Sequence, residues 1–159
     1  MHIVLFEPEI PPNTGNIARL CAGTDTPLHL IEPLGFSLED RYLRRAGLDY
    51  WPHVRLRVWR SLEEYLATEG PEGGAGRRLV MTSARASEQS VPVHRFPFEA
   101  EDALVFGPET RGLPPEVLQR SECRIRIPIN DNIRSLNLST AAGIVLMTAL
   151  ARTGGLEAW

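Results

Sequence analysis

The chain has 159 residues and a formal net charge of -3, with 43% hydrophobic and 23% charged residues. This length suits one globular domain, 1–159, and the composition excludes disordered, collagen-like and low-complexity chains. The longest nearly apolar stretch, 141–151, is too short to span a bilayer, and the first residues lack the basic segment of a signal peptide. We therefore expect a cytoplasmic protein with no membrane partner.

Cysteine usage and charge narrow the class of protein further. Cys21 and Cys123 lie far apart and show no metal-ligand spacing, so we expect reduced thiols and no metal site. The basic residues are all arginines, which either a GC-rich genome or phosphate recognition explains. The mild acidity argues against a general polyanion binder and against a DNA partner, while a local basic patch stays open.

Short apolar runs separated by polar segments predict six strands. In chain order they cover His2–Phe6, Leu28–Ile31, Arg55–Trp59, Leu79–Thr82, Ala103–Phe106 and Arg124–Ile129. Helical patterns lie between several of these runs, and strands that alternate with helices predict an α/β fold with a mostly parallel sheet flanked by helices.

The predicted helices follow the same order. Three prolines in 7–12 predict a loop, after which Asn13 is expected to cap a helix that stops near Gly23. A short polar helix is expected over 38–46, and a helix capped by Ser61 is expected to run through Leu66. A Gly/Pro-rich turn over 107–115 precedes another short helix, and the longest helix, 137–152, is largely apolar.

Three polar segments follow predicted strands, where open α/β sheets place their ligands. In the first, Asn13 and Arg19 bracket the start of a helix, whose free N–H groups attract anions. A capped helix with a solvated arginine explains the same residues, and on composition alone it is the better explanation.

The second segment runs from the strand end at Phe106 through Gly107, Glu109 and Arg111 to Pro114. Gly107 allows a ligand to approach the backbone closely, and a charged pair follows on a stiff turn. A tight strand-to-helix turn is the alternative, and the two glycines and two prolines around the pair favour a ligand site.

The third segment follows Ile127 and Pro128 and ends with Ser135, Asn137 and Ser139 at alternate positions before an apolar helix. Hydroxyl and amide groups in this pattern either cap the helix or hold a ligand against loop backbone. The sequence shows no Walker A loop, GxGxxG, GxSxG or HExxH motif, and its four histidines stand alone.

Taken together, the three segments resemble the SPOUT class of RNA methyltransferases. The resemblance rests on their order: Asn13, Gly15 and Arg19, then 106–114, then 127–128 with 135–139. It covers nearly the whole chain, and segments 7–16 and 43–50 are similar to the small subfamily that methylates the ribose 2′-hydroxyl of the tRNA wobble nucleotide, position 34, on cytidine or uridine.

The resemblance implies a homodimer, a trefoil knot over roughly 75–159, and S-adenosyl-L-methionine as cofactor. It implies cofactor contacts at Met81, Gly107, Ile127 and Ser135. It also implies catalytic roles for Arg19, Ser135 and Asn137, and substrate contacts at Asn13 and Glu109. Apart from the resemblance, three arginines fall within five residues at Arg41, Arg44 and Arg45. This arginine patch is either a solvated helix face or, with two copies in a dimer, a surface that contacts phosphates of the tRNA anticodon stem.

Because a guanidinium group stays protonated, we expect Arg19 to orient the ribose or its phosphate and to stabilise the developing oxyanion, rather than to act as a base. A phosphate or a water molecule would take the proton. Glu109 is expected to hold its own loop.

Two other functions stay open at this point. One is a ribosomal RNA 2′-O-methyltransferase, and the other is a non-catalytic RNA- or cofactor-binding module of the same fold.

Overall fold

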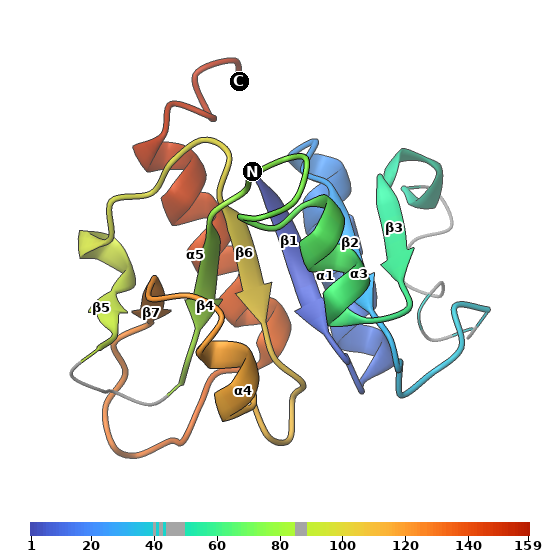
Figure 1. Ribbon diagram of the computed structural model, residues 1–159, viewed down its shortest axis with the longest axis horizontal. Helices are drawn as coiled ribbons and strands as arrows, with labels where there is room; N and C mark the ends of the chain where they lie inside the picture. Colours follow the sequence, from blue (N-terminus) through green and yellow to red (C-terminus); the bar gives the residue numbers. More distant parts are fainter. Residues whose placement is uncertain (40, 42, 44–49, 85–88) are drawn as a thin grey trace.

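The computed structural model describes residues 1–39, 41, 43, 50–84 and 89–159. Its centre is a seven-stranded sheet in the order β3-β2-β1-β6-β4-β7-β5, in which every recorded strand pair is parallel (Figure 1). The strands are β1 (His2–Phe6), β2 (Leu28–Ile31), β3 (Leu56–Trp59), β4 (Leu79–Thr82), β5 (Val91–Pro92), β6 (Ala103–Phe106) and β7 (Arg124–Arg126). The expected mostly parallel α/β fold is confirmed.

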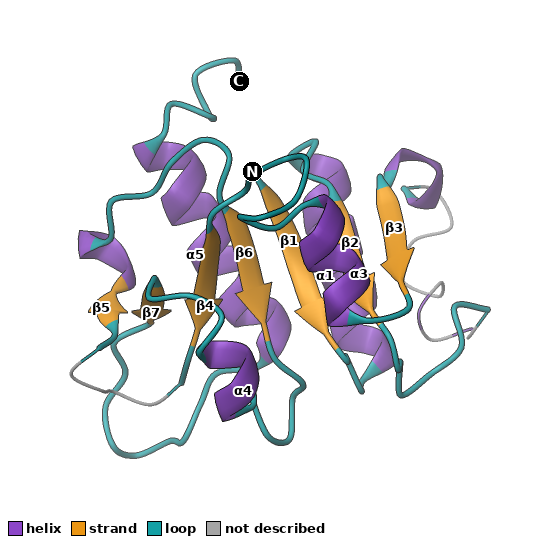
Figure 2. Ribbon diagram, in the orientation of Figure 1, coloured by secondary structure: helices purple, strands orange, loops and turns teal. Residues whose placement is uncertain are grey.

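Helices cover both faces of the sheet. Figure 2 shows α1 (Pro11–Gly23) and α5 (Leu138–Arg152) on one face, and α3 (Leu62–Thr68) and α4 (Pro115–Leu118) on the other. Two short 3₁₀ helices, Trp51–His53 and Val93–Arg95, complete the described elements. Because both faces are covered, β1, β2 and β6 are buried at every position, as the continuous apolar runs predicted.

The sheet separates two apolar cores. One lies under α1 and α5 and includes Ile17 and Val145, and the other lies under α3 and α4 and includes Leu66 and Val117. The helix α5 buries Ala142, Val145, Leu146 and Ala149 but leaves Ile144 and Met147 exposed.

A cluster of aromatic and imidazole rings lies on the α3 face of β1, β2 and β3. The ring centroids of His2 and His29 are 4.3 Å apart, the Nε2 of His2 is 2.8 Å from the hydroxyl oxygen of Tyr65, and the indole N–H of Trp59 donates to the Nδ1 of His29 over 3.2 Å. Burial lowers the pKa of His2 to about 2 and that of His29 to about 4. Both rings are therefore neutral in the fold at pH 7.

The start of α1 differs from the prediction. Ile10 is the N-cap residue, and Pro11 and Pro12 form the first helical positions instead of a loop. Proline fits there because the first N–H groups of a helix have no intrahelical acceptor. Asn13 therefore does not cap the helix, and its side chain is available for other contacts.

The predicted caps of two helices are confirmed, whereas Leu38 and Glu39 form a turn rather than the start of the expected helix. Ser61 caps α3 by accepting from the N–H of Glu64 over 3.1 Å, and Asn137 caps α5. The two-residue strand β5 is too short for a periodic signal, and β7 ends at Arg126 rather than Ile129. In the helix expected over 38–46, Arg41 and Leu43 are helical, and 40, 42 and 44–46 lie outside the described residues.

Candidate active site

The three motif segments meet at the carboxyl edge of the sheet. They follow β1, β6 and β7, and the order of the strands places β1 beside β6, and β4 between β6 and β7. In Figure 1 the arrowheads of these strands point to one edge, where the connections to α1, α4 and α5 begin. Parallel topology alone brings 7–10, 107–114 and 127–137 to the same edge.

The carboxylate of Glu109 joins the second segment to the first. One carboxylate oxygen accepts from the N–H of Glu9 over 2.8 Å, and the other accepts from the N–H of Ile10 over 3.1 Å and from the side-chain amide of Asn13 over 3.4 Å. Glu109 therefore satisfies donors just before and within the first turn of α1, which have no acceptor in the helix itself.

Asn13 joins the third segment to this contact. Its side-chain oxygen accepts from the amide of Asn137 over 2.9 Å, and Asn13 is 6% exposed. The side-chain oxygen of Asn137 accepts from the N–H of Ser139 at 2.9 Å and the N–H of Thr140 at 3.3 Å. A continuous chain of hydrogen bonds thus runs from Glu109 to the start of α5.

Two further contacts tie the same loops together. The hydroxyl of Thr110 donates to the carboxylate of Glu9 over 2.8 Å, and Arg111 forms an ion pair with Glu7. Neither of these two glutamates nor Thr110 had a role predicted from the sequence. An acidic pair in a proline-rich loop reveals its partners only once β1 and β6 are known to be neighbours.

Arg19 lies exposed on α1, with its guanidinium carbon 5.8 Å from the ring centroid of Tyr50. The hydroxyl of Tyr50 donates to the carbonyl oxygen of Gly15 over 2.8 Å, so the ring is anchored to α1. A Cβ at Gly15 would lie 2.8 Å from the carbonyl oxygen of Leu43, which explains why this motif position holds glycine.

The four expected cofactor positions occupy different surroundings. Met81 is 1% exposed in the core under α3 and α4, and Ile127 is half-buried against the opposite core. Ser135 is exposed on the loop before α5. A Cβ at Gly107 would lie 2.2 Å from the backbone nitrogen of Leu113, so the requirement for glycine arises inside the turn itself. The expected close approach of a ligand to the backbone of Gly107 stays a prediction.

The expected arginine patch is described only in part. Arg41 is exposed, and Arg44 and Arg45 lie outside the described residues. No group of three or more potential metal ligands occurs among the residues with described positions. In that same part of the chain, no helix has the length and apolarity needed to cross a membrane.

Comparison with known proteins gives consistent matches. The model of the SpoU rRNA Methylase family matches residues 1–147. The tRNA (cytidine(34)-2'-O)-methyltransferase of Methylovorus glucosotrophus (strain SIP3-4) is 48% identical over 149 residues, covering 92% of each chain.

Comparison with solved structures gives the same family as the sequence matches. A structure described as "Structural insights into the 2-OH methylation of C/U34 on tRNA" matches with a TM-score of 0.85 and 45% identity, covering 95% of this chain and 94% of that one. An AdoMet-bound rRNA methyltransferase from Sinorhizobium meliloti shares the fold, with a TM-score of 0.78, 23% identity, and coverage of 94% of this chain and 55% of that one. On these matches and the three joined motif segments, the chain belongs to the SpoU rRNA methylase family.

Proposed function

We propose that the chain transfers a methyl group from S-adenosyl-L-methionine to the ribose 2′-hydroxyl of nucleotide 34, cytidine or uridine, in tRNA. The observation that carries the proposal is the hydrogen-bond chain from Glu109 through Asn13 to Asn137, which joins all three motif segments at one edge of the sheet. The near full-length relatives named for this activity support the same substrate.

The neighbouring carboxyl ends of β4, β6 and β7 support binding of the cofactor at this edge. These three strands are neighbours, so Met81, Gly107 and Ile127 lie near adjacent strand ends. Half-buried Ile127 offers an apolar surface to a flat base. Gly107 has no side chain that could stand between its backbone and a ligand. The exposed hydroxyl of Ser135 is available to either substrate. The cofactor, when bound, supplies an electrophilic methyl group on a sulfonium.

With the cofactor bound, the ribose 2′-oxygen would form a bond to the methyl carbon while the sulfur–carbon bond breaks, and the hydroxyl proton would have to leave. We assign to Arg19 the holding of a ribose or phosphate oxygen, and the exposure of its guanidinium beside the anchored ring of Tyr50 supports this role. Its fixed charge stabilises negative charge that develops on the oxygen. The proton passes to a phosphate oxygen or to water.

Glu109, Asn13 and Asn137, whose hydrogen bonds join the three motif segments, act by positioning the active-site loops. Glu109 and Asn13 direct their hydrogen-bonding groups at protein partners, and Asn137 holds the first turn of α5. The geometry of the reacting groups depends on such support, because a displacement of about 1 Å lowers a rate by about 100-fold.

Further properties belong to the same proposal. Exposed Ile144 and Met147 on α5 support a homodimer that covers this helix, since large apolar side chains gather at such interfaces. Membership of the SpoU rRNA methylase family, together with the resemblance of the motifs, supports a trefoil knot over roughly 75–159. A tRNA substrate supports a cytoplasmic location.

Ribosomal RNA is the second candidate substrate, because the matching family model is described by rRNA methylation. The near full-length relatives favour tRNA. A non-catalytic binding module is disfavoured by the presence of every motif residue from Asn13 to Asn137.

The test is methyl transfer from labelled S-adenosyl-L-methionine by the purified protein, followed by mass spectrometry of the digested nucleosides. We expect a 2′-O-methylated nucleotide at position 34 of tRNA, and no product with a matched transcript that carries a 2′-deoxynucleotide there. Cells lacking the gene should lose the same modified nucleoside. If ribosomal RNA were methylated and tRNA were not, ribosomal RNA would be the substrate and the tRNA proposal would be wrong.

A further inference from the structure

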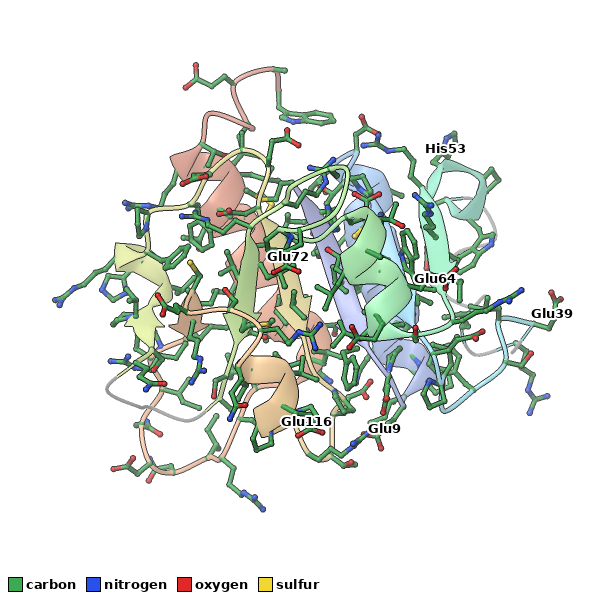
Figure 3. The ribbon with its side chains drawn as sticks, in the orientation of Figure 1. Glu9, Glu39, His53, Glu64, Glu72 and Glu116 are labelled. Carbon is green, nitrogen blue, oxygen red and sulfur yellow. The ribbon has the colours of Figure 1, made fainter. Side chains whose placement is uncertain are left out.

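A surface groove begins beside the candidate active site and runs outward past β1 and β2 towards β3. It consists of two adjoining hollows of about 220 and 570 Å³ that share Pro33 and Leu34. The inner hollow is walled by Glu7, Glu9, Gly35 and Arg111, and the outer one by Glu32, Phe36, Ser37, Leu38 and Arg60. In Figure 3, Glu9 lies below the strand ends and Glu39, just past the outer wall, lies farther out beyond β3.

The groove is fixed to the loops of the active site. The N–H of Gly35 donates to the carbonyl oxygen of Pro8 over 2.9 Å, and a Cβ at Gly35 would lie 2.8 Å from the Cα of Glu9. The inner wall therefore packs directly on the loop that Glu109 and Thr110 hold. The groove therefore begins at the loop that also belongs to the candidate active site.

The outer part of the groove combines an apolar floor with an available cation. Pro33, Leu34 and half-buried Phe36 supply the floor. Arg60 is exposed and has no ion-pair partner among the residues whose positions are described. Its backbone is fixed, because its N–H donates to the carboxylate of Glu64 over 2.8 Å.

These features fit a nucleotide better than a peptide or a second copy of the chain. Aromatic side chains stack on bases, and this stacking strengthens nucleic-acid binding whichever base is present. A guanidinium at the edge of the floor binds phosphate. The exposed carboxylate of Glu32 can accept from an exocyclic amino group of a base.

We propose that the groove between Arg111 and Arg60 binds a nucleotide adjacent to the methylated one, with its base on Phe36 and its phosphate on Arg60. This inference rests on the proposed function, because an RNA strand that presents one ribose at the active site must continue along the surface on either side. The groove then contributes to the choice of RNA and takes no part in methyl transfer itself.

The first test compares tRNA binding by Arg60→Ala and by a matched control, Arg55→Ala. Arg55 and Arg60 flank the two ends of β3, both are exposed, and Arg55 instead contacts Asp25. Loss of a phosphate contact should raise KM for tRNA and reduce the salt dependence of binding by roughly 0.7–0.9 in the log–log slope. Arg55→Ala should leave both unchanged, and the affinity for S-adenosyl-L-methionine should be unchanged in both variants.

The second test addresses stacking. Phe36→Leu keeps an apolar side chain of similar size but removes the ring, and we expect roughly 5- to 100-fold weaker tRNA binding with little change in kcat. A tRNA with 2-aminopurine at position 33 or 35 should lose fluorescence on binding the wild-type protein, and should keep it with Phe36→Leu. Phe36→Tyr should behave as the wild type.

The outcomes separate the two proposals. If the wild-type protein methylates tRNA while Arg60→Ala matches Arg55→Ala and the probe reports no stacking at either position, the groove proposal is wrong and the proposed function stands. If the wild-type protein neither binds nor methylates tRNA, the proposed function is wrong and the groove proposal falls with it.

Discussion

Glu109→Gln is the most informative single substitution in the active site. The carboxylate accepts three hydrogen bonds, from the backbone N–H groups of Glu9 and Ile10 and from the amide of Asn13. Glutamine has nearly the same shape but only one accepting oxygen. Whichever way its amide turns, an NH₂ group faces a donor that the carboxylate satisfied.

The structure sets the size of the effect. A hydrogen bond to a charged group contributes about 1.5–3 kcal/mol, and an unsatisfied buried donor costs about 1–3 kcal/mol. The N–H of Ile10 is exposed, so water can replace the lost acceptor there. We therefore expect Glu109→Gln to lower the free energy of unfolding by about 2 kcal/mol. We also expect it to lower kcat by about 10- to 100-fold, because the loops that Glu109 joins shift relative to each other.

The matched control is Glu116→Gln. Glu116 is an exposed glutamate on α4 (Figure 3), and its side chain forms no hydrogen bond or ion pair with any residue that the structure describes. It should change stability by less than about 0.5 kcal/mol. Urea denaturation at one protein concentration should place the midpoint of Glu109→Gln roughly 1 M lower. If the two variants unfold alike and have equal kcat, Glu109 does not hold the loops together.

Four other outcomes follow from the site and the core. Calorimetry should show S-adenosyl-L-methionine binding at about one site per chain, and Gly107→Ala should lower both stability and this affinity, because its Cβ meets the backbone of Leu113. Arg19→Ala should lose methyl transfer while it keeps cofactor binding, and full activity of Arg19→Lys would show that a bidentate guanidinium is unnecessary. The triple variant Arg41→Ala/Arg44→Ala/Arg45→Ala should bind tRNA more weakly with a smaller salt slope, and an unchanged slope would assign these arginines to a solvated surface. His2 and His29 have pKa values of about 2 and about 4 in the fold, against 6.5 when the chain is unfolded. The stability that these neutral rings allow is complete above pH 6.5, and it should decrease as the pH falls towards 4, by roughly 3–4 kcal/mol at pH 5. Denaturation at pH 7.5 and at pH 5 measures this loss, and equal midpoints would contradict the buried neutral rings.

The strands could be predicted because a strand that is buried on both faces of the sheet has a continuous run of apolar residues. The runs at β1, β2, β4 and β6 match the structure residue for residue. The order of strands could not be predicted, since no local pattern records that β6 enters between β1 and β4. That order decides which loops become neighbours, and so it also decides the site.

Asn13 shows how a local signal misleads at a functional position. Its place after two prolines is typical of an N-cap, but proline also fits the first turn of a helix, so α1 begins earlier. The amide of Asn13 is then free to contact Glu109 and Asn137, which are 96 and 124 residues away in sequence. Only the resemblance to a family indicated that these three residues belong together.

The acidic net charge is compatible with an RNA substrate because the charges are not spread evenly. Many carboxylates pair with arginines at the amino edge of the sheet, where Arg55 meets Asp25, and Arg77 and Arg78 meet Glu101 and Asp102.

At the carboxyl edge, Arg60 and Arg134 are exposed and have no ion-pair partner among the described residues. A four-residue strand spans roughly 13 Å, which exceeds the screening length of about 8 Å at physiological ionic strength. An RNA strand at the carboxyl edge therefore responds mainly to the charges beside it, and the acidic groups at the opposite edge are largely screened from it. The nearby charges include the carboxylates of Glu7, Glu9 and Glu32 as well as the arginines, so contact with RNA there depends on where Arg60 and Arg134 lie and not on an overall positive edge.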